Sequence, residues 1–391
     1  MPQWRKITSP LSILSQKKLT PRMPIMCSGL PKTALGLRIR ATLSEKRMKP
    51  NLKGLLKEEL VDFFREMDEP AYRAHQLMQW LYNKKVSSFE EMTNLPKTLR
   101  EKLAENATVT SLSIQEIQRS EDGACKYLLR LSDGELIESV YIPDERRRTL
   151  CISSQVGCAF KCRFCATGKM GFTRQMDASE IVDQIVTVNR DLSADERIGN
   201  IVIMGMGEPL HNYKNLLKAV RLMVDESGLQ IGGRKITIST VGLVPQIDRL
   251  ADEGLNIRLA ISLNASTNRL RSRLMPINEK YPIEMLIKSA RNFYKKTGNR
   301  LTFEYVLIGD TNDSIQDANQ LIDLTSSFPC KVNLIPYNPR KESLYRPSSA
   351  AVKNRFYQQL QARHPYAVTL RRSRGGDISA ACGQLGIRPN G

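Results

Sequence analysis

The sequence has 391 residues, of which 41% are apolar, and a formal net charge of +19. No run of residues approaches the roughly eighteen consecutive apolar positions that a membrane-spanning helix needs, so we expect a soluble, cytoplasmic protein with no membrane partner. Three of the eight cysteines fall within eight residues, unlike the spacing in secreted disulfide scaffolds, which favours thiolate ligands in a reducing compartment.

Residues 1–50 form a basic extension with eleven Lys or Arg and a single acid, Glu45. The segment has no apolar periodicity, which is typical of a disordered region. An organellar import peptide, or a true start at Met23, Met26 or Met48, explains the composition equally well. The positive charge favours a polyanionic partner such as nucleic acid.

Residues 51–108 predict a small helical accessory domain, because apolar residues such as Leu56, Leu60 and Phe64 recur at helical spacing. Residues 109–145 predict a β-hairpin linker region. Its strands, KYLLRL and ELIESVYI, flank Asp133-Gly134, a pair typical of tight turns with positive φ, and the second strand carries Glu138.

Residues 146–391 alternate β-rich runs with amphipathic segments, which predicts a parallel α/β sheet, either doubly wound or curled into a full or partial barrel. The predicted strands are 150–155, 201–204, 235–240, 258–263, 301–308, 331–336 and, as a seventh, 368–372. The predicted helices lie near 179–190, 213–225, 246–254, 282–297, 313–327 and 350–363. In either architecture, loops at the carboxyl ends of the strands should carry the functional site.

Cys158, Cys162 and Cys165 follow the first of these strands. Electron-transfer clusters usually have four cysteine ligands, whereas three leave one iron open to a small molecule. A structural zinc ion would need a fourth Cys or His, and the three histidines (His75, His211 and His364) are isolated in the sequence.

The spacing of these cysteines, with Phe164 before the last, resembles the signature of the radical S-adenosylmethionine (SAM) superfamily. The resemblance implies a partial (β/α)6 barrel and one [4Fe-4S] cluster, whose open iron binds SAM and splits it to a 5′-deoxyadenosyl radical. In the turn Gly205-Met206-Gly207-Glu208-Pro209, glycines allow close approach of a ligand and Glu208 can receive the ammonium group of SAM.

Two further cysteines stand apart from this motif. Cys151 precedes it by seven residues, and Cys382 lies in a Gly-flanked segment near the C-terminus that could bring a nucleophilic thiolate into a site. Isolated cysteines are usually small buried hydrophobic residues, and we interpret Cys27, Cys125 and Cys330 in that way.

From about residue 52 to residue 391 the chain resembles the RlmN/Cfr family of radical SAM RNA methyltransferases, RlmN-type enzymes above all. The motifs that carry the resemblance are, in chain order, SSQVGCAFKCRFCATG, GMGEPL, ISLNA, MPIN, EYVLI, NLIPYNP and RGGDISAACGQLG. The resemblance implies methylation of carbon 2 of adenine in the peptidyl transferase centre of 23S ribosomal RNA and next to the anticodon of transfer RNA. It also implies two SAM per turnover, an electron donor such as flavodoxin or ferredoxin, and a monomer.

By the same resemblance, Cys382 is methylated first, its methyl group then bonds to the RNA, and Cys151 attacks the Cys382 sulfur to release the product as a disulfide forms. Glu138 matches the residue that the resemblance implies as the base, which takes the proton from carbon 2 of adenine. The residues that should line the SAM pocket are Gly207, Glu208, Ser239, Ser262, Leu263, Asn264 and Asn338. Asn264 replaces the usual histidine of the family, and its amide can donate or accept as a neutral imidazole does.

Basic residues should guide the RNA, and the candidates are Arg371, Arg372, Arg374, Lys84, Lys85, Lys97, Arg100 and Lys102. Two other readings stay open. A Cfr-like enzyme would methylate carbon 8 of adenine with the same cysteines, and a non-catalytic RNA-binding protein would keep the metal site for structure alone or lose it.

Overall fold

The structure is a computed structural model that describes residues 49–386, except for residues 146, 194–195 and 341–342. These residues belong to one compact unit that begins at Lys49. The predicted basic extension lies outside the described residues, apart from its last two positions. No described helix is both long and apolar enough to cross a membrane.

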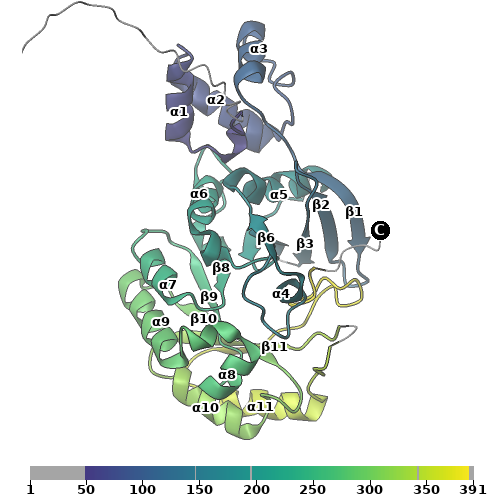
Figure 1. Cartoon of the computed structure of the whole chain (residues 1–391), viewed down its shortest axis with the longest axis vertical. Coiled ribbons are helices and arrows are strands. Elements are labelled where there is room, and N and C mark those ends of the chain that lie inside the picture. The colour runs from purple at the N-terminus through teal and green to yellow at the C-terminus, as the bar shows by residue number, and fades with distance from the viewer. Residues whose placement is uncertain (1–48, 146, 194–195, 341–342, 387–391) are drawn as a thin grey trace, which may run out of the picture. The chain divides into compact units, whose positions relative to one another are not determined.

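Short helices open the described chain (Figure 1). They are η1 (Leu52–Gly54), α1 (Lys57–Glu66), α2 (Tyr72–Met78), the π-helix η2 (Gln79–Lys84) and α3 (Lys97–Asn106). Leu60 and Phe64 are one helical turn apart and are both buried, as the sequence pattern predicts. Lys53 in η1 forms a buried ion pair with Asp183, with 2.7 Å between Nζ and Oδ1, and this contact fixes the helical group on the rest of the unit.

An antiparallel sheet follows, made of β1 (Ser113–Arg119), β2 (Cys125–Arg130), β3 (Leu136–Asp144) and β4 (Arg147–Cys151). The predicted hairpin is present as β2 and β3. The sequence did not reveal β1, because its register shifts between Ile114 and Glu116 and breaks the alternation of apolar residues. Only Gly134 has a positive φ (+90°) in the β2–β3 turn, so the expectation of a second one at Asp133 was wrong.

From β4 onward the sheet is parallel. Its order continues from β4 through β7 (Asn200–Ile203), β8 (Ile236–Thr240), β9 (Arg258–Ser262), β10 (Leu301–Leu307), β11 (Cys330–Pro336) and β12 (Val368–Leu370). Neighbours in the sheet follow one another along the chain, as in a barrel, and the ten-stranded sheet is not closed. The predicted partial (β/α)6 barrel with a seventh strand is confirmed.

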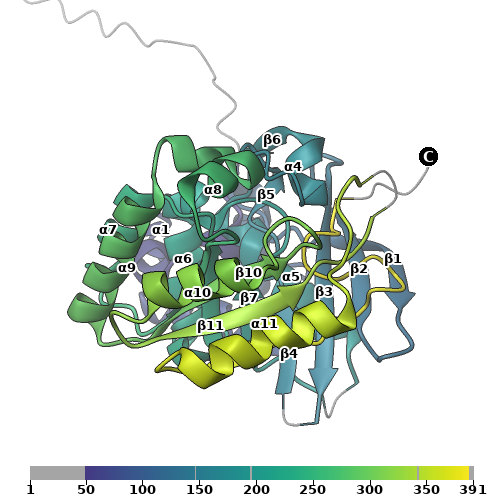
Figure 2. The ribbon, with the colours of Figure 1, turned by 90° about the horizontal axis from the view of Figure 1, so that it is seen from below.

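The helices that connect these strands lie outside the curved sheet (Figure 2). They are α5 (Ala178–Asp191), α6 (Tyr213–Val224), α7 (Val244–Leu250), α9 (Ile283–Thr297), α10 (Ile315–Thr325) and α11 (Ala350–Arg363). Each agrees with a predicted helix to within a few residues, because its apolar residues repeat at helical spacing over several turns.

Shorter elements were not predicted. They are β5 (Gln155–Gly157), α4 (Ala166–Met170), β6 (Phe172–Gln175), η3 (Pro209–Asn212), η4 (Gly233–Lys235), α8 (Asn268–Leu274) and η5 (Pro276–Glu279). The predicted strand 150–155 divides into β4 and β5 because Ser153 and Ser154 turn away from the ladder. The Ser153 hydroxyl donates to the carbonyl of Glu138 (2.7 Å) and accepts from the Met206 amide (2.8 Å). Of these shorter elements, all but η4 lie in loops that follow strands, where the site was expected.

Candidate functional site

The three clustered cysteines occupy the loop between β5 and α4. Gly157, with φ +74°, begins this loop, and a Cβ there would lie 2.0 Å from the carbonyl oxygen of Gly171. The next residue, Cys158, donates its amide to that same oxygen over 2.7 Å. Gly168 plays a similar part, because its Cβ would meet the Cys162 carbonyl at 2.9 Å. Glycine at both positions lets the backbone fold tightly around the cysteines.

Cys158 and Cys162 are buried, and Cys165 is partly exposed. Burial raises the pKa of Cys158 to about 12 and the pKa of Cys162 well above its usual value, and the nearby Cys165 and Cys158 add to the shift of Cys162. A bound metal centre reverses this preference, since its positive charge stabilises thiolates. Without a metal centre the two buried cysteines are therefore neutral thiols, and with a metal centre they can bind it as thiolates.

Among the described residues, no three side chains of His, Cys, Asp or Glu converge as the ligands of a single ion do. A cubane cluster has a different requirement, because each cysteine binds its own iron and the sulfurs stand apart. Cys162 and Cys165 line one cavity of about 150 Å³, which leaves space beside their thiols. These residues fit a [4Fe-4S] cluster held by Cys158, Cys162 and Cys165, with the cavity beside it for a small molecule.

The same cavity brings together five of the residues expected to bind SAM. They come from the ends of β7, β8 and β9, and all of them line the cavity: Gly207, Glu208, Ser239, Ser262 and Asn264. These strands are neighbours in the sheet, so their carboxyl ends meet at one edge.

Leu263 and Asn338 are placed differently. The Leu263 side chain is fully buried in the core, and its backbone amide donates to the carbonyl of Glu304 over 3.0 Å. Asn338 donates from Nδ2 to the carbonyl oxygen of Cys382 over 3.1 Å. Asn338 therefore contacts the segment that carries Cys382, and neither residue is part of the cavity lining.

Glu208 is the acidic group at the end of β7. Its Oε2 accepts from the Val241 amide (2.8 Å) and its Oε1 from the Leu210 amide (3.1 Å), which fixes the carboxylate in the cavity wall. Burial raises the pKa of Glu208 to about 7, and the hydrogen bond from the Val241 amide opposes this shift. A cationic ligand would stabilise the charged form, and the ammonium group of SAM has that charge.

Asn264, at the position of the family's histidine, has a left-handed backbone with φ +57°. Asn and His are both enriched in this conformation. The Asn264 Oδ1 accepts from the Val306 amide over 2.9 Å, and its Nδ2 faces the sulfur of Met275 at 3.3 Å. The side chain thus satisfies two groups of the cavity wall by hydrogen bonding.

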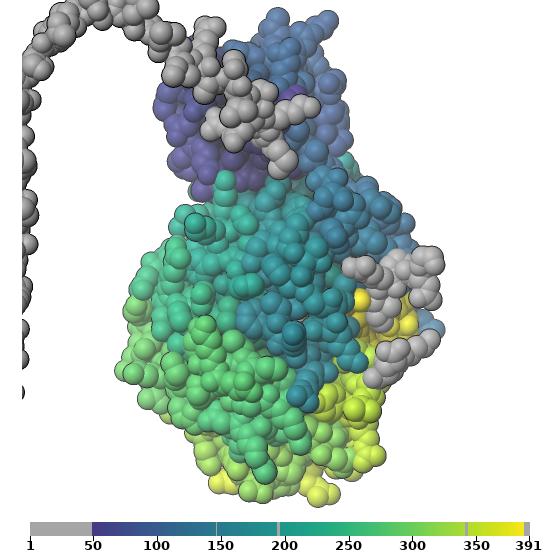
Figure 3. All heavy atoms as spheres, viewed as in Figure 1, coloured from purple at the N-terminus to yellow at the C-terminus, as the bar shows by residue number. Residues whose placement is uncertain are grey.

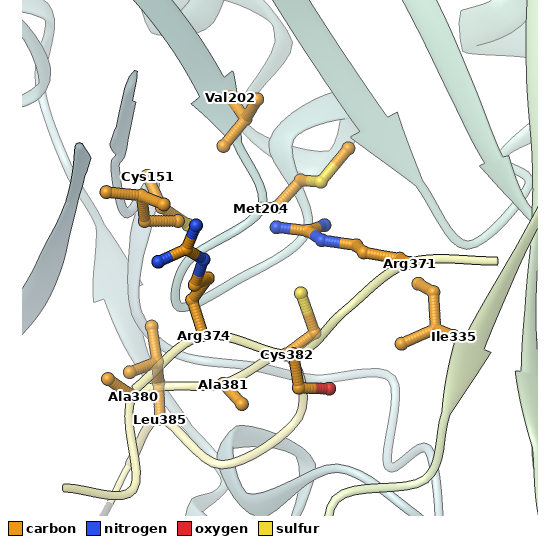
Figure 4. Close-up of a pocket in the computed structure, with 12 residues that line it drawn as sticks. Cys151, Val202, Met204, Ile335, Arg371, Arg374, Ala380, Ala381, Cys382 and Leu385 are labelled. Atoms are coloured by element: carbon orange, nitrogen blue, oxygen red, sulfur yellow. The ribbon is translucent and has the colours of Figure 1, made fainter. Parts of the chain in front are cut away.

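Cys151 and Cys382 line a second, small cavity together with Arg371 and Arg374 (Figure 4). Figure 4 shows the thiol of Cys382 and the guanidinium of Arg371 pointing into the space beside Cys151. Both cysteines are free thiols in the structure. Burial raises the pKa of Cys151 to about 12, Cys382 adds to this effect, and the positive charge of Arg371 opposes it. The sequence suggested Arg371 only as a guide for RNA; the fold places it beside both thiols.

This second cavity adjoins the first. Met204, Ile335 and Cys382 line both, so Cys382 faces the proposed SAM site on one side and Cys151 on the other. A residue placed in this way can receive a group in one cavity and pass it to a substrate in the next.

The segment 374–386 carries Cys382 and is attached to several elements. Asp377 accepts from the Ser120 hydroxyl (2.6 Å) in the β1–β2 turn, and Thr167 of α4 donates to the carbonyl of Leu385 (2.7 Å). Figure 3 shows part of the C-terminal chain, in yellow, exposed at the surface of the molecule. The strand β1, which sequence analysis missed, thus helps to form the turn that holds the cysteine segment.

Glu138 lies in a third cavity, which also contains Lys126 and Asp377. Its Oε1 is 3.3 Å from Lys126 Nζ, and its Oε2 accepts from the Gly386 amide. Burial raises the pKa of Glu138, and the charge of Lys126 opposes the shift. The structure does not bring Glu138 into the cavity of the two cysteines; it places Glu138 under the end of the segment that carries Cys382.

Sequence reasoning did not find Glu304, Lys126 or Arg271. Glu304 lines the proposed SAM cavity and accepts from Asn333 Nδ2 over 2.6 Å; its sequence signal is a lone acid within the apolar strand EYVLI. Arg271 is fully buried and donates to the carbonyls of Val241 (2.7 Å) and Ser262 (3.1 Å), which joins the ends of β8 and β9. An arginine in the polar segment 267–273 gave no sequence signal for such a role.

Several basic residues that were expected to guide RNA have partners within the protein. Lys85 donates to the carbonyl of Asn189 (3.0 Å), Arg100 to that of Glu90 (2.7 Å) and Arg374 to that of Asp122 (2.8 Å). Lys84 and Arg372 are exposed.

Two family profiles match parts of this chain. Residues 50–109 match the family profile described as ribosomal RNA large subunit methyltransferase N-terminal domain, and residues 152–322 match that of the radical SAM superfamily. The dual-specificity RNA methyltransferase RlmN of Pelobacter propionicus is 47% identical over 337 residues, which cover 86% of this chain and 96% of the relative. The RlmN of Geobacter sulfurreducens is 46% identical over 346 residues, 87% of this chain and 94% of the relative.

A solved structure agrees with these matches. The crystal structure of a radical SAM methyltransferase from Sphaerobacter thermophilus superimposes with a TM-score of 0.83 at 45% identity, covering 86% of this chain and 99% of that one. The extent of these matches, together with the cysteine loop and its cavity, shows that the chain belongs to the RlmN family of RNA methyltransferases, within the radical SAM superfamily.

Proposed function

We propose that this protein methylates carbon 2 of a specific adenine in 23S ribosomal RNA and in transfer RNA, using a methyl group carried on the sulfur of Cys382. The observation that carries the proposal is the position of Cys382, which lines both the cavity beside Cys162 and Cys165 and the cavity of Cys151. The RlmN relatives, named as dual-specificity RNA methyltransferases, support RNA as the substrate.

The chemistry explains why a cysteine carrier is needed. Carbon 2 of adenine is electron-poor and is not a nucleophile toward the methyl group of SAM. When bound, the [4Fe-4S] cluster supplies the electron that cleaves a second SAM, and this cleavage provides the oxidant that removes hydrogen from the methyl group on Cys382. Residues of the cavity wall, Glu208 and Asn264 among them, orient SAM for both uses.

The chain's own residues then act on the adduct. The methylene carbon on the Cys382 sulfur bonds to carbon 2 of adenine. Glu138 then takes the proton that leaves this carbon, and the unpaired electron of the adduct would return to the bound cluster, so that a closed-shell thioether remains. The thiolate of Cys151 attacks the Cys382 sulfur, so that a disulfide forms as the carbon–sulfur bond breaks, and the released methylene carbon takes up a proton to become the methyl group. The cavity shared by the two thiols measures only about 20 Å³, the space of about one water, so the segment 374–386 must shift to admit an adenine. The same shift would uncover Glu138, whose Oε2 accepts from the Gly386 amide.

The test uses anaerobically reconstituted protein, SAM, a one-electron reductant and a 23S ribosomal RNA fragment, with the modified nucleoside identified by mass spectrometry. We expect 2-methyladenosine, about four irons per chain and release of 5′-deoxyadenosine. Cys382→Ala should abolish methylation, and Cys151→Ala should accumulate a covalent protein–RNA adduct. Cys330→Ala is the matched control, because Cys330 is a buried cysteine on β11 outside these cavities.

Three outcomes contradict the proposal. The product 8-methyladenosine would identify a Cfr-like activity. A colourless protein that binds RNA and leaves SAM intact would identify a binding protein. Normal turnover by Cys151→Ala would exclude its role in releasing the product.

A further inference from the structure

An open cavity of about 780 Å³ adjoins Cys162, which also lines the proposed SAM site. Residues of the cysteine loop, of α4 and α8, and of the segment 343–345 form its wall. The loop and α8 are joined directly, because the Arg163 amide donates to the carbonyl of Leu274 over 3.0 Å. Figure 1 shows α4 and α8 on the same side of the molecule.

This basic cavity presents four exposed cations, Lys161, Arg163, Lys169 and Arg273. None of the four forms an ion pair with any residue that the structure describes. The one acidic residue of the described wall, Asp310, is already paired with Arg346. The cavity therefore has an excess of unpaired positive charge, which attracts an acidic partner.

Cys162 is the residue common to the basic cavity and the proposed SAM cavity. A cluster held by Cys162 would thus border two cavities, with SAM in one and a partner at the basic cavity. Electron transfer weakens steeply with distance, so a protein that reduces the cluster must come close to one of its ligands. The basic cavity gives such a protein access while the SAM site is occupied.

We propose that the basic cavity is the docking site of an acidic electron-transfer protein that reduces the cluster, an inference that rests on the proposed function. One electron leaves the reduced flavin or iron–sulfur centre of the donor and enters the cluster, so that the donor is oxidised and the cluster reduced by one electron each. Leu344, a fully exposed apolar residue on the wall, supplies an apolar contact within the charged surface. Such an interface suits the small and transient contacts of redox partners.

RNA also carries negative charge, but two observations disfavour it here. The basic cavity shares no lining residue with the cavity of Cys151 and Cys382, which an adenine has to enter. It holds one aromatic residue, Tyr345, whose ring is in T-shaped contact with Tyr337 at 6.2 Å between the ring centres, whereas sites for single-stranded RNA commonly stack successive bases on several aromatic rings.

The test compares two double charge reversals on the reconstituted protein. Lys169→Glu with Arg273→Glu alters the basic cavity and leaves the cysteine loop intact. Lys295→Glu with Arg355→Glu is the matched control, because these exposed residues on α9 and α11 lie away from it. The probe is an acidic flavodoxin. Its binding in the oxidised form is measured by fluorescence anisotropy, and cluster reduction by its reduced form is followed by absorbance at several salt concentrations.

We expect the cavity variant to bind flavodoxin at least about tenfold more weakly at low salt, with a proportional loss in the reduction rate, and the difference to shrink as salt screens the charges. Reduction by photoreduced deazaflavin, which needs no docking site, should be unchanged in both variants. Equal flavodoxin binding by the cavity variant and the control would overturn the proposal. So would a loss of RNA binding with flavodoxin binding intact, which would assign the cavity to RNA.

These outcomes are separate from the proposed function. If the unaltered protein, reduced by deazaflavin, did not methylate RNA, the proposed function would fail, and the binding of flavodoxin would still be measurable.

Discussion

Asn338 donates a hydrogen bond from its side-chain amide to the carbonyl oxygen of Cys382 over 3.1 Å. This contact links the loop after β11 to the segment that carries the thiol of the proposed methyl carrier. Asn338→Ala removes it and should destabilise the bound position of the segment by about 1 kcal/mol. We expect the S-methylation of Cys382 to slow about fivefold and the affinity for SAM to change little. The methylation is measured by peptide mass spectrometry after a single exposure to SAM.

Gln361→Ala is the control for this experiment, because Gln361 is an exposed amide on α11. If Asn338→Ala instead weakened SAM binding and left the methylation rate at saturating SAM unchanged, Asn338 would be a SAM contact, as the family resemblance implied.

Arg371 provides the positive charge beside the two thiols. This charge opposes the effect of burial on the pKa of Cys151, so the substitution Arg371→Met should raise that pKa. The alkylation of Cys151 by iodoacetamide near neutral pH should then slow about tenfold for each unit by which the pKa rises. Arg372→Met removes the charge of the next residue, which is exposed and lies outside this cavity. Equal effects of the two variants would contradict a local role for Arg371.

Glu208 should make SAM binding dependent on pH. Burial raises its pKa to about 7, so the free protein holds Glu208 mostly protonated below that pH. The ammonium group of SAM favours the carboxylate, and binding must then release a proton. Between about pH 5.5 and pH 7, affinity should rise by up to about tenfold per pH unit.

Calorimetry in two buffers of different ionisation enthalpy checks the proton release directly. Glu208→Gln should bind SAM more weakly at pH 8 and should lose this pH dependence. An unchanged slope in the variant would show that another group titrates.

The buried pair of Lys53 and Asp183 should contribute strongly to stability. Lys53→Met leaves Asp183 charged in the core, where only the Leu112 amide (2.6 Å) and the Thr187 hydroxyl (3.4 Å) still donate to it. We expect the free energy of unfolding to fall by about 3–5 kcal/mol. Arg65→Met breaks the exposed pair with Asp62 and should cost less than about 1 kcal/mol. Urea denaturation measures both, and similar losses would mean that the buried pair contributes no more than a surface pair.

The sequence by itself determined the succession of βα units in a parallel sheet and the cysteine loop. The family resemblance implied that the sheet curls into a partial barrel, and the structure confirmed it. The long helices and buried strands repeat their apolar residues over several turns or positions, and this repetition does not depend on distant contacts. The three cysteines and Gly207-Glu208 could be assigned to the site because each follows a strand of a βα unit, and parallel strands bring their carboxyl ends together. The family resemblance added Cys151, Cys382 and Glu138.

Only the tertiary structure decided how these groups are divided among cavities. Arg371 lies beside Cys151 because β12 packs next to β11 and the segment after it folds back over the sheet, a contact between residues more than two hundred positions apart. Glu138 shares a cavity with Lys126 because the two strands pair in one particular register. Strand β1, the loop helices and buried Arg271 are likewise fixed by long-range packing and hydrogen bonds, and local sequence patterns carry no information about such contacts.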